Sequence, residues 1–293
     1  MKPPRFDYRR PETLAEVVEL LDHHAGDAAI LAGGQSLMPM LNLRVAQPAV
    51  LIDINAVPEL DRIGRAGNRL SIGGRARHND VFRSGEVAQA APLLTLALEH
   101  VAHEAIRNRG TLGGSLALAD PAAELPACMV CLDADIVAAS VKGERRIPAG
   151  TFFQGLYTTA LKPNEILARV DVPVAGAGWR FGFDEVARRR GDFAIAGVAL
   201  AVREKSDVVA GCRISLLGVE MSPRRMEAAE ACLLNAPLGT SANIAAALSA
   251  LRGMLDPIEG GEIPPEYRIH VACELLARTI RRMAAPANGK GAH

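Results

Sequence analysis

Two glycine-rich stretches of similar sequence constrain this chain more than any other feature. The first is Leu31-Ala-Gly-Gly-Gln-Ser-Leu37, and the second is Gly110-Thr-Leu-Gly-Gly-Ser-Leu116. In each, a Gly-Gly pair lies between an apolar run and a segment that can begin a helix. Because glycine has no Cβ, such a pair lets the backbone turn sharply and lie close to another group.

The two stretches also have the chemistry of a phosphate site. Exposed backbone N–H groups after each pair, with Ser36 or Ser115 beside them, form a cradle for phosphate oxygens at a helix N-terminus. Two such cradles together could hold an extended diphosphate. Each stretch taken alone is better explained as a simple tight turn.

The composition is typical of a soluble globular protein. Of the 293 residues, 49% are apolar and 23% are charged, enough for sizeable cores in two or three subdomains. Lysine plus arginine equals aspartate plus glutamate at 33 each, so no overall field attracts nucleic acid. The N-terminal segment has no apolar leader, and no stretch reaches the roughly 18 apolar residues of a membrane span. We expect a cytoplasmic protein without a membrane span.

Cysteine and histidine spacing gives little support to a metal centre. The five cysteines are scattered, and Cys128-x-x-Cys131 falls in an apolar run typical of a buried helix face. His100-x-x-His103-Glu104 lacks a third ligand at a recognisable spacing, which favours solvated histidines on a helix. No metal-binding residue is predicted.

The pattern of elements changes after the Pro/Gly-bearing segment 173–178. Before it, short strands are predicted at 28–31, 50–54, 60–63, 69–72, 135–139, 144–147 and 165–172. Helices are predicted at 14–24, 78–82, 93–103 and from Asp120-Pro121 onward. After it, strands at 179–186, 195–202 and 208–219 precede helices at 225–234, 241–255 and 267–283. A block of strands followed by a block of helices indicates a separate α+β domain.

Motifs for catalysis by the protein itself are missing. The sequence has no G-x-S-x-G, no HExxH and no G-x-x-x-x-G-K-[ST], and neither Gly pair is followed by a lysine. A strand–GxGxxG–helix dinucleotide fingerprint is also missing. No catalytic residue is predicted, so the chain is expected to hold a cofactor that brings its own reactivity.

Four ordered motifs resemble a known family. They are Ala32-Gly-Gly-Gln-Ser-Leu37, Ile106-Arg-Asn-Arg-Gly-Thr-Leu-Gly-Gly-Ser115, Asp120-Pro-Ala-Ala-Glu124 and Arg188-Arg-Arg-Gly-Asp-Phe-Ala194. Together they are similar to the flavoprotein (medium) subunit of the molybdenum hydroxylases, which include aerobic carbon monoxide dehydrogenase and xanthine dehydrogenase. The similarity covers nearly the whole chain.

The resemblance implies an α+β fold with an FAD-binding domain of the p-cresol methylhydroxylase type and a C-terminal domain of antiparallel sheet and helices. The implied subdomains are 1–55 and 56–175, followed by the C-terminal domain 179–285 and a flexible tail 286–293. Carried over by position, the implied FAD-binding residues are Ile30, Leu31, Ala32, Gly33, Gly34, Gln35, Ser36, Leu37, Thr111, Gly113, Gly114, Ser115, Asp120, Glu124, Leu167, Glu185 and Phe193. Phe193 is also compatible with a core position in the C-terminal sheet.

The sequence departs from the family pattern at two places. Relatives commonly carry a lysine where this chain has Asp184 or Glu185, and an acid there changes how charge on a reduced flavin is stabilised. Where relatives often have a threonine after an Ile-Gly pair, this chain has Ile72-Gly-Gly-Arg-Ala76.

The function implied by the resemblance is electron transfer in a complex. Electrons from a large molybdopterin-binding subunit would pass through two [2Fe–2S] clusters on a small subunit to this chain's FAD and then to an external acceptor. A dimer of heterotrimers is the implied assembly. A stand-alone flavin-dependent oxidase of the same fold and a nucleotide-binding scaffold without redox function remain the alternatives. The substrate and the final acceptor are not encoded in recognisable motifs.

Overall fold

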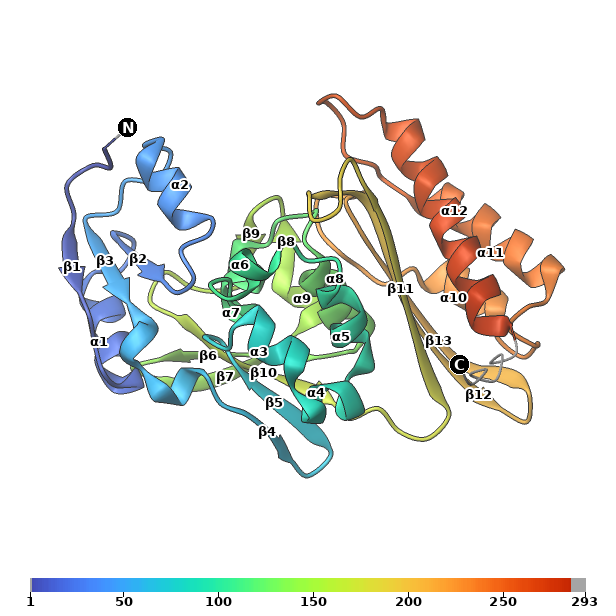
Figure 1. Cartoon of the computed structure of the whole chain (residues 1–293), viewed down its shortest axis with the longest axis horizontal. Coiled ribbons are helices and arrows are strands. Elements are labelled where there is room, and N and C mark those ends of the chain that lie inside the picture. Colours follow the sequence, from blue (N-terminus) through green and yellow to red (C-terminus); the bar gives the residue numbers. More distant parts are fainter. Residues whose placement is uncertain (1, 286–293) are drawn as a thin grey trace, which may run out of the picture. The chain divides into compact units, whose positions relative to one another are not determined.

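The computed structural model describes residues 2–285 (Figure 1). These residues form two compact units. The first unit comprises 2–90, 102–120 and 133–174, and the second comprises 91–101, 121–132 and 175–285. The predicted tail 286–293 lies outside the described residues. Each unit therefore contains segments that are distant in sequence, and each has its own core.

A small parallel sheet begins the first unit. Its strand order is β1-β3-β2, with β1 at Asp7–Arg9, β2 at Ala28–Leu31 and β3 at Val50–Asp53. Helix α1 (Leu14–His23) buries Val17 and Leu21, and the side chain of Thr13 caps it by accepting a hydrogen bond from the Glu16 amide at 3.2 Å. This sheet positions the first glycine stretch, because β2 ends at Leu31 and α2 (Leu37–Asn42) follows.

A five-stranded antiparallel sheet forms the rest of the first unit's framework, in the order β4-β5-β10-β6-β7. Its strands are Ile63–Ala66, Arg69–Gly73, Ile166–Pro173, Asp135–Ser140 and Gly143–Pro148 in that order. Among the short helices of this unit are α3 (His78–Arg83), α4 (Gly85–Ala90), α6 (Glu104–Arg107), α7 (Leu112–Leu118) and α9 (Ala149–Phe152). Strands β8 (Phe153–Gly155) and β9 (Thr158–Thr159) form a separate hairpin.

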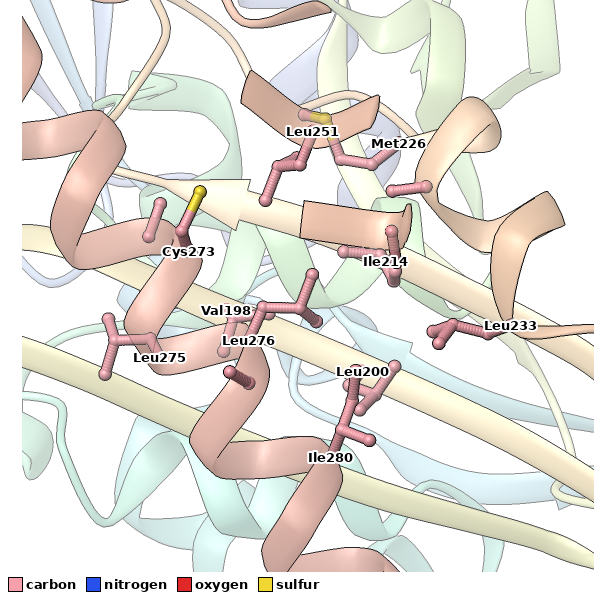
Figure 2. Packing of buried hydrophobic residues seen from close by; sticks show 14 of the residues in the cluster. Val198, Leu200, Ile214, Met226, Leu233, Leu251, Cys273, Leu275, Leu276 and Ile280 are labelled. Atoms are coloured by element: carbon pink, nitrogen blue, oxygen red, sulfur yellow. The ribbon is translucent and has the colours of Figure 1, made fainter. Parts of the chain in front are cut away.

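The second unit is built on one antiparallel sheet covered on both faces. Its strands β11 (Trp179–Ala187), β12 (Ala194–Lys205) and β13 (Val208–Leu217) pair in that order. Helices α10 (Glu227–Leu233), α11 (Ser241–Met254) and α12 (Pro265–Ala284) supply one apolar layer. Figure 2 shows Leu276 and Ile280 of α12 beside Val198 and Leu200 of β12.

Helices α5 (Pro92–Leu98) and α8 (Glu124–Cys131) also pack on this sheet, although they come from the N-terminal half of the chain. Because side chains alternate along a strand, Ala199 and Ala201 point to the face opposite Val198 and Leu200, and both alanines are fully buried. Burial on both faces explains why the stretch 194–202 of β12 has no charged residue.

Three element predictions are wrong. The strand predicted at 60–63 is wrong because Leu60 ends a 3-10 helix at Pro58–Leu60 and β4 starts only at Ile63. The helix predicted at 93–103 ends at Leu98, and the left-handed φ of 42° at Ala102 excludes a continuous helix to residue 103. The helix predicted from Asp120-Pro121 begins at Glu124, because Ala119 is also left-handed and 120–123 is extended or turn. None of the described helices is long and apolar enough to cross a membrane.

Candidate cofactor site

The first glycine stretch is a tight turn whose geometry requires glycine. Gly33 is buried, and a Cβ added to it would lie 2.4 Å from the Arg109 carbonyl oxygen and 2.9 Å from Gly110 Cα. Gly34 has a φ of +73°, a left-handed conformation that side chains disfavour. The backbone geometry therefore requires glycine at both positions.

The amides of this turn are available to a ligand. Within residues 2–285, the amides of Gly33, Gly34, Gln35 and Ser36 have no hydrogen-bond acceptor. Ser36 is exposed and sits at the N-cap of α2 without using its hydroxyl as a cap. A row of unpaired N–H groups beside a free hydroxyl suits an anionic oxygen.

The second glycine stretch differs from the prediction. Gly113 and Gly114 lie inside the first turn of α7, and their amides are already bonded, to the Gly74 carbonyl at 2.9 Å and to the Thr111 hydroxyl at 3.1 Å. The Ser115 amide donates to the Thr111 carbonyl. The expectation of exposed N–H groups is therefore wrong for this stretch, since Thr111 caps the helix itself.

The folded first unit brings the two glycine stretches together. The Arg109–Gly110 backbone lies directly against Gly33, while Gly113 lies against the backbone of Gly74, where an added Cβ would be 2.5 Å from the Gly74 carbonyl oxygen. Gly74 in turn lies against the carbonyl of Leu167, which is buried in β10 at an irregularity in its pairing. Four backbone segments thus meet without intervening side chains.

His78 supports the second stretch from the side. Its backbone amide donates to the Gly110 carbonyl at 2.9 Å, and its ring lies where a Gly110 side chain would point, with Nδ1 3.0 Å from that position. Burial lowers the pKa of His78 to about 4, so the ring is neutral near pH 7. Its role here is packing against the turn.

Two polar residues that the sequence did not predict link the stretches. Asn55 donates from Nδ2 to the Ala32 carbonyl at 3.0 Å and accepts a hydrogen bond from the Arg77 guanidinium. The same guanidinium donates to the Arg109 carbonyl. The signal in the sequence was weak: polar Asp53 ends a buried strand, Asn55 comes two residues later, and Arg77 follows a Gly-Gly pair.

The remaining predicted residues occupy different places. In the first unit, Asp120 accepts a hydrogen bond from the Tyr157 hydroxyl at 3.4 Å. In the second unit, Glu124 begins α8, Glu185 lies on β11, and Phe193 lies in the loop between β11 and β12. Phe193 is 72% exposed, so its alternative interpretation as a core residue is wrong. Their proposed contacts with a cofactor remain predictions.

His100 and Glu185 form a pair within the second unit. The Nδ1 atom of His100 lies 3.5 Å from Glu185 Oε1, and the Glu185 side chain is only 5% exposed. The hydrogen bond to Glu185 is the main cause of a raised His100 pKa, with the charges of Glu185, Asp184 and Glu124 adding to it and burial opposing it. His100 follows the end of α5, so the prediction of a solvated helical histidine is wrong.

This pair predicts a component of stability that depends on pH. Protonated His100 is favoured in the folded chain, so its contribution is complete below its ordinary pKa near 6.5 and is lost as pH rises through the higher folded pKa. We expect the melting temperature of the wild type to fall across that range more than that of His100→Gln. Thermal unfolding followed by circular dichroism at a series of pH values measures this. The same change of melting temperature with pH in the two proteins would contradict this prediction.

The Cys128-x-x-Cys131 pair lies on α8 with both side chains fully buried. Burial raises the pKa of both thiols, so neither is a thiolate at neutral pH. The predicted buried helix face is confirmed. Within the described residues no group of three or more metal-ligating side chains is found.

Comparison with known proteins gives matches along the whole chain. A family model described as the FAD binding domain in molybdopterin dehydrogenase matches residues 4–175, and one described as the CO dehydrogenase flavoprotein C-terminal domain matches residues 181–283. The 6-hydroxypseudooxynicotine dehydrogenase complex subunit alpha of Paenarthrobacter nicotinovorans is 39% identical over 283 residues, covering 96% of this chain and 95% of its own. The carbon monoxide dehydrogenase medium chain of Hydrogenophaga pseudoflava is 36% identical, covering 96% and 97%.

Solved structures agree with these sequence matches. A chain of carbon monoxide dehydrogenase from Hydrogenophaga pseudoflava superposes with a TM-score of 0.93 at 37% identity, covering 98% of this chain and 100% of its own. A chain of quinoline 2-oxidoreductase from Pseudomonas putida 86 gives a TM-score of 0.91 at 37% identity, covering 97% and 98%. The similarity therefore extends through both the sequence and the fold.

Proposed function

Since the chain belongs to the family of FAD-binding medium subunits of molybdenum hydroxylases, we propose that it is the electron-transfer subunit of such a complex. Its class is oxidoreductase and its cofactor is FAD. The p-cresol methylhydroxylase-type fold expected from the resemblance agrees with the matched domains and structures.

The first glycine turn carries the assignment of the diphosphate site. A Cβ at Gly33 would collide with backbone, Gly34 is left-handed, and the amides from Gly33 to Ser36 lack acceptors within residues 2–285. These features fit a diphosphate, which needs a close backbone approach and several donors. We assign Ile30–Leu37 to this role.

The second stretch supports the site in another way. The amides of Gly113, Gly114 and Ser115 already donate hydrogen bonds within the chain, so they are not free to bind the ligand. We propose that these residues, two of which lack side chains, let the ligand lie close to the first turn of α7. The Ser115 hydroxyl is the group that remains for hydrogen bonding to the ligand. Thr111 fixes the start of α7, and Leu167 supplies a buried backbone against Gly74. Asp120, Glu124, Glu185 and Phe193 are proposed as further contacts.

FAD supplies the redox chemistry when bound, accepting electrons and passing them on. The residues of this chain bind it, orient it and keep its phosphates paired. We propose that the electrons come from a small [2Fe–2S] subunit, that a large molybdopterin subunit oxidises the substrate, and that the complex is a dimer of heterotrimers. The support is that relatives are named as subunits or medium chains of dehydrogenases.

Reoxidation of the partner's clusters tests this function. The chain is co-expressed with the proposed large and small subunits, the purified complex is reduced with dithionite and desalted, and an external acceptor is added. We expect the electron paramagnetic resonance signal of reduced clusters to decay quickly with FAD bound and slowly in a complex stripped of flavin. Equal decay rates in the two preparations would refute electron transfer through this subunit.

A further inference from the structure

The contact between the two glycine stretches is held at both of its edges by one pair of side chains. On one side, Asn55 Nδ2 donates to the carbonyl of Ala32, the residue before Gly33, at 3.0 Å. On the other side, the Arg77 guanidinium donates to the carbonyl of Arg109, the same oxygen against which Gly33 lies. The two side chains also bond each other, through Arg77 Nη2 and Asn55 Oδ1.

We call this pair the Asn55–Arg77 bridge, and other hydrogen bonds hold each of its members in place. The Asp53 carboxylate accepts from the Asn55 amide at 2.9 Å and from Asn55 Nδ2 at 2.6 Å, and Tyr8 donates its hydroxyl to the same carboxylate. These hydrogen bonds fix which end of the Asn55 amide faces Arg77. Arg77 is fixed by a backbone bridge to Thr111. The bridge therefore has a single geometry.

The hydrogen bonds of the bridge do not neutralise the charge of Arg77. The hydrogen-bond partners of Arg77 are a carbonyl and an amide oxygen, which are neutral. Burial is the main cause that lowers the pKa of Arg77, the Arg109 and Arg75 guanidiniums lower it further, and the Asp80 and Asp53 carboxylates oppose this. Arginine stays charged at neutral pH, and a partly buried guanidinium beside unpaired amides favours a nearby anion.

We propose that Asn55 and Arg77 are positioning residues for the FAD diphosphate. They fix Ala32 relative to Arg109 before the cofactor arrives, so that the amides from Gly33 to Ser36 already point in the binding direction. Preorganisation of this kind raises affinity by reducing the ordering cost of binding. The inference rests on the proposed placement of the diphosphate at the first glycine turn.

A double-mutant cycle on the full-length chain tests the bridge. FAD affinity is measured by quenching of flavin fluorescence for the wild type, Asn55→Ala, Arg77→Ala and the double variant. We expect each single variant to bind FAD about tenfold more weakly, and the double variant to be little worse than either, because both lose the same bridge. Effects that multiply in the double variant would overturn the proposal.

Two further variants separate positioning from charge and from folding. Arg77→Lys keeps the charge but cannot bond two oxygens with one planar group, so we expect it to stay weak, and wild-type affinity in this variant would overturn the bridge. Arg83→Ala is the matched control, because among residues 2–285 Arg83 forms an ion pair only with exposed Glu104, at 2.7 Å, and its loss should leave FAD affinity unchanged. The melting temperature of the flavin-free variants is measured alongside, and a loss of affinity that follows only from unfolding contradicts the proposal.

A Gly33→Val variant separates a failure of the Asn55–Arg77 bridge from a failure of the diphosphate assignment. If Gly33→Val binds FAD normally, the placement of the diphosphate at the first glycine turn is wrong, and the bridge then has no role in binding it. If Gly33→Val loses FAD while Arg77→Ala and Asn55→Ala bind normally, the turn is correct and only the bridge fails.

Discussion

A Gly33→Val variant is expected to lose FAD. The Cβ of any residue at position 33 would lie 2.4 Å from the Arg109 carbonyl oxygen and 3.0 Å from the Arg109 carbonyl carbon, and backbone atoms cannot move aside as a flexible side chain can. The two glycine stretches must then separate, which moves the unpaired amides away from the diphosphate. We expect the FAD dissociation constant to rise by about 100-fold or more, equivalent to about 2.7 kcal/mol. Flavin content after purification and fluorescence titration measure this.

Gly85→Ala is the matched control for this variant. Gly85 is exposed at the start of α4, has no atom within 4 Å of an added Cβ, and has no positive φ. We expect this variant to retain FAD. A Gly33→Val protein that purifies with the wild-type flavin content would show that the first turn does not hold the cofactor.

A Glu230→Ala variant is expected to destabilise the second unit strongly. Glu230 is 6% exposed, and its carboxylate accepts hydrogen bonds from the Ile214 amide at 2.8 Å and from Arg225 at 2.7 and 2.6 Å. Its removal leaves the buried Ile214 N–H without this acceptor and takes away the Glu230 partner of the Arg225 guanidinium. Breaking a buried ion pair from one side costs about 3–5 kcal/mol. Chemical denaturation followed by circular dichroism measures the free energy of unfolding.

Glu227 offers the control on the same helix. It is an exposed carboxylate in the first turn of α10, so Glu227→Ala should change the free energy of unfolding by no more than about 0.5 kcal/mol. Glu230→Gln should fall between the two, since its amide oxygen still accepts from Ile214. A Glu230→Ala protein as stable as Glu227→Ala would mean that the Arg225 pair contributes nothing.

The sequence predicted the family, the FAD cofactor and the α+β class because these depend on motifs and on periodicity. Short local patterns also located β11, β12 and β13 closely, and the left-handed pair Ser206 and Asp207 turns the chain between the strands predicted at 195–202 and 208–219. Such features are local in the chain. They are therefore readable from neighbouring residues.

Features that depend on distant residues were not predictable in the same way. The role of Arg77 depends on the Arg109 carbonyl and on Asn55, which folding alone brings together. His100 was expected on a helix because apolar spacing continues past Leu98, but the left-handed Ala102 and the contact with Glu185 decide its position. The internal bonding of Gly113 and Gly114 was missed because it needs the Gly74 carbonyl and the Thr111 hydroxyl as acceptors.

The interleaving of α5 and α8 with the sheet of β11, β12 and β13 limits how this protein can be divided. A truncation or gene fusion at the segment around residue 175 would separate the sheet from two helices that shield one side of it. The C-terminal fragment would expose the alanine-lined side of β12 to water, inviting aggregation. We therefore expect chimaeras of related subunits to fold only when α5 and α8 come from the same parent protein as the sheet that they cover.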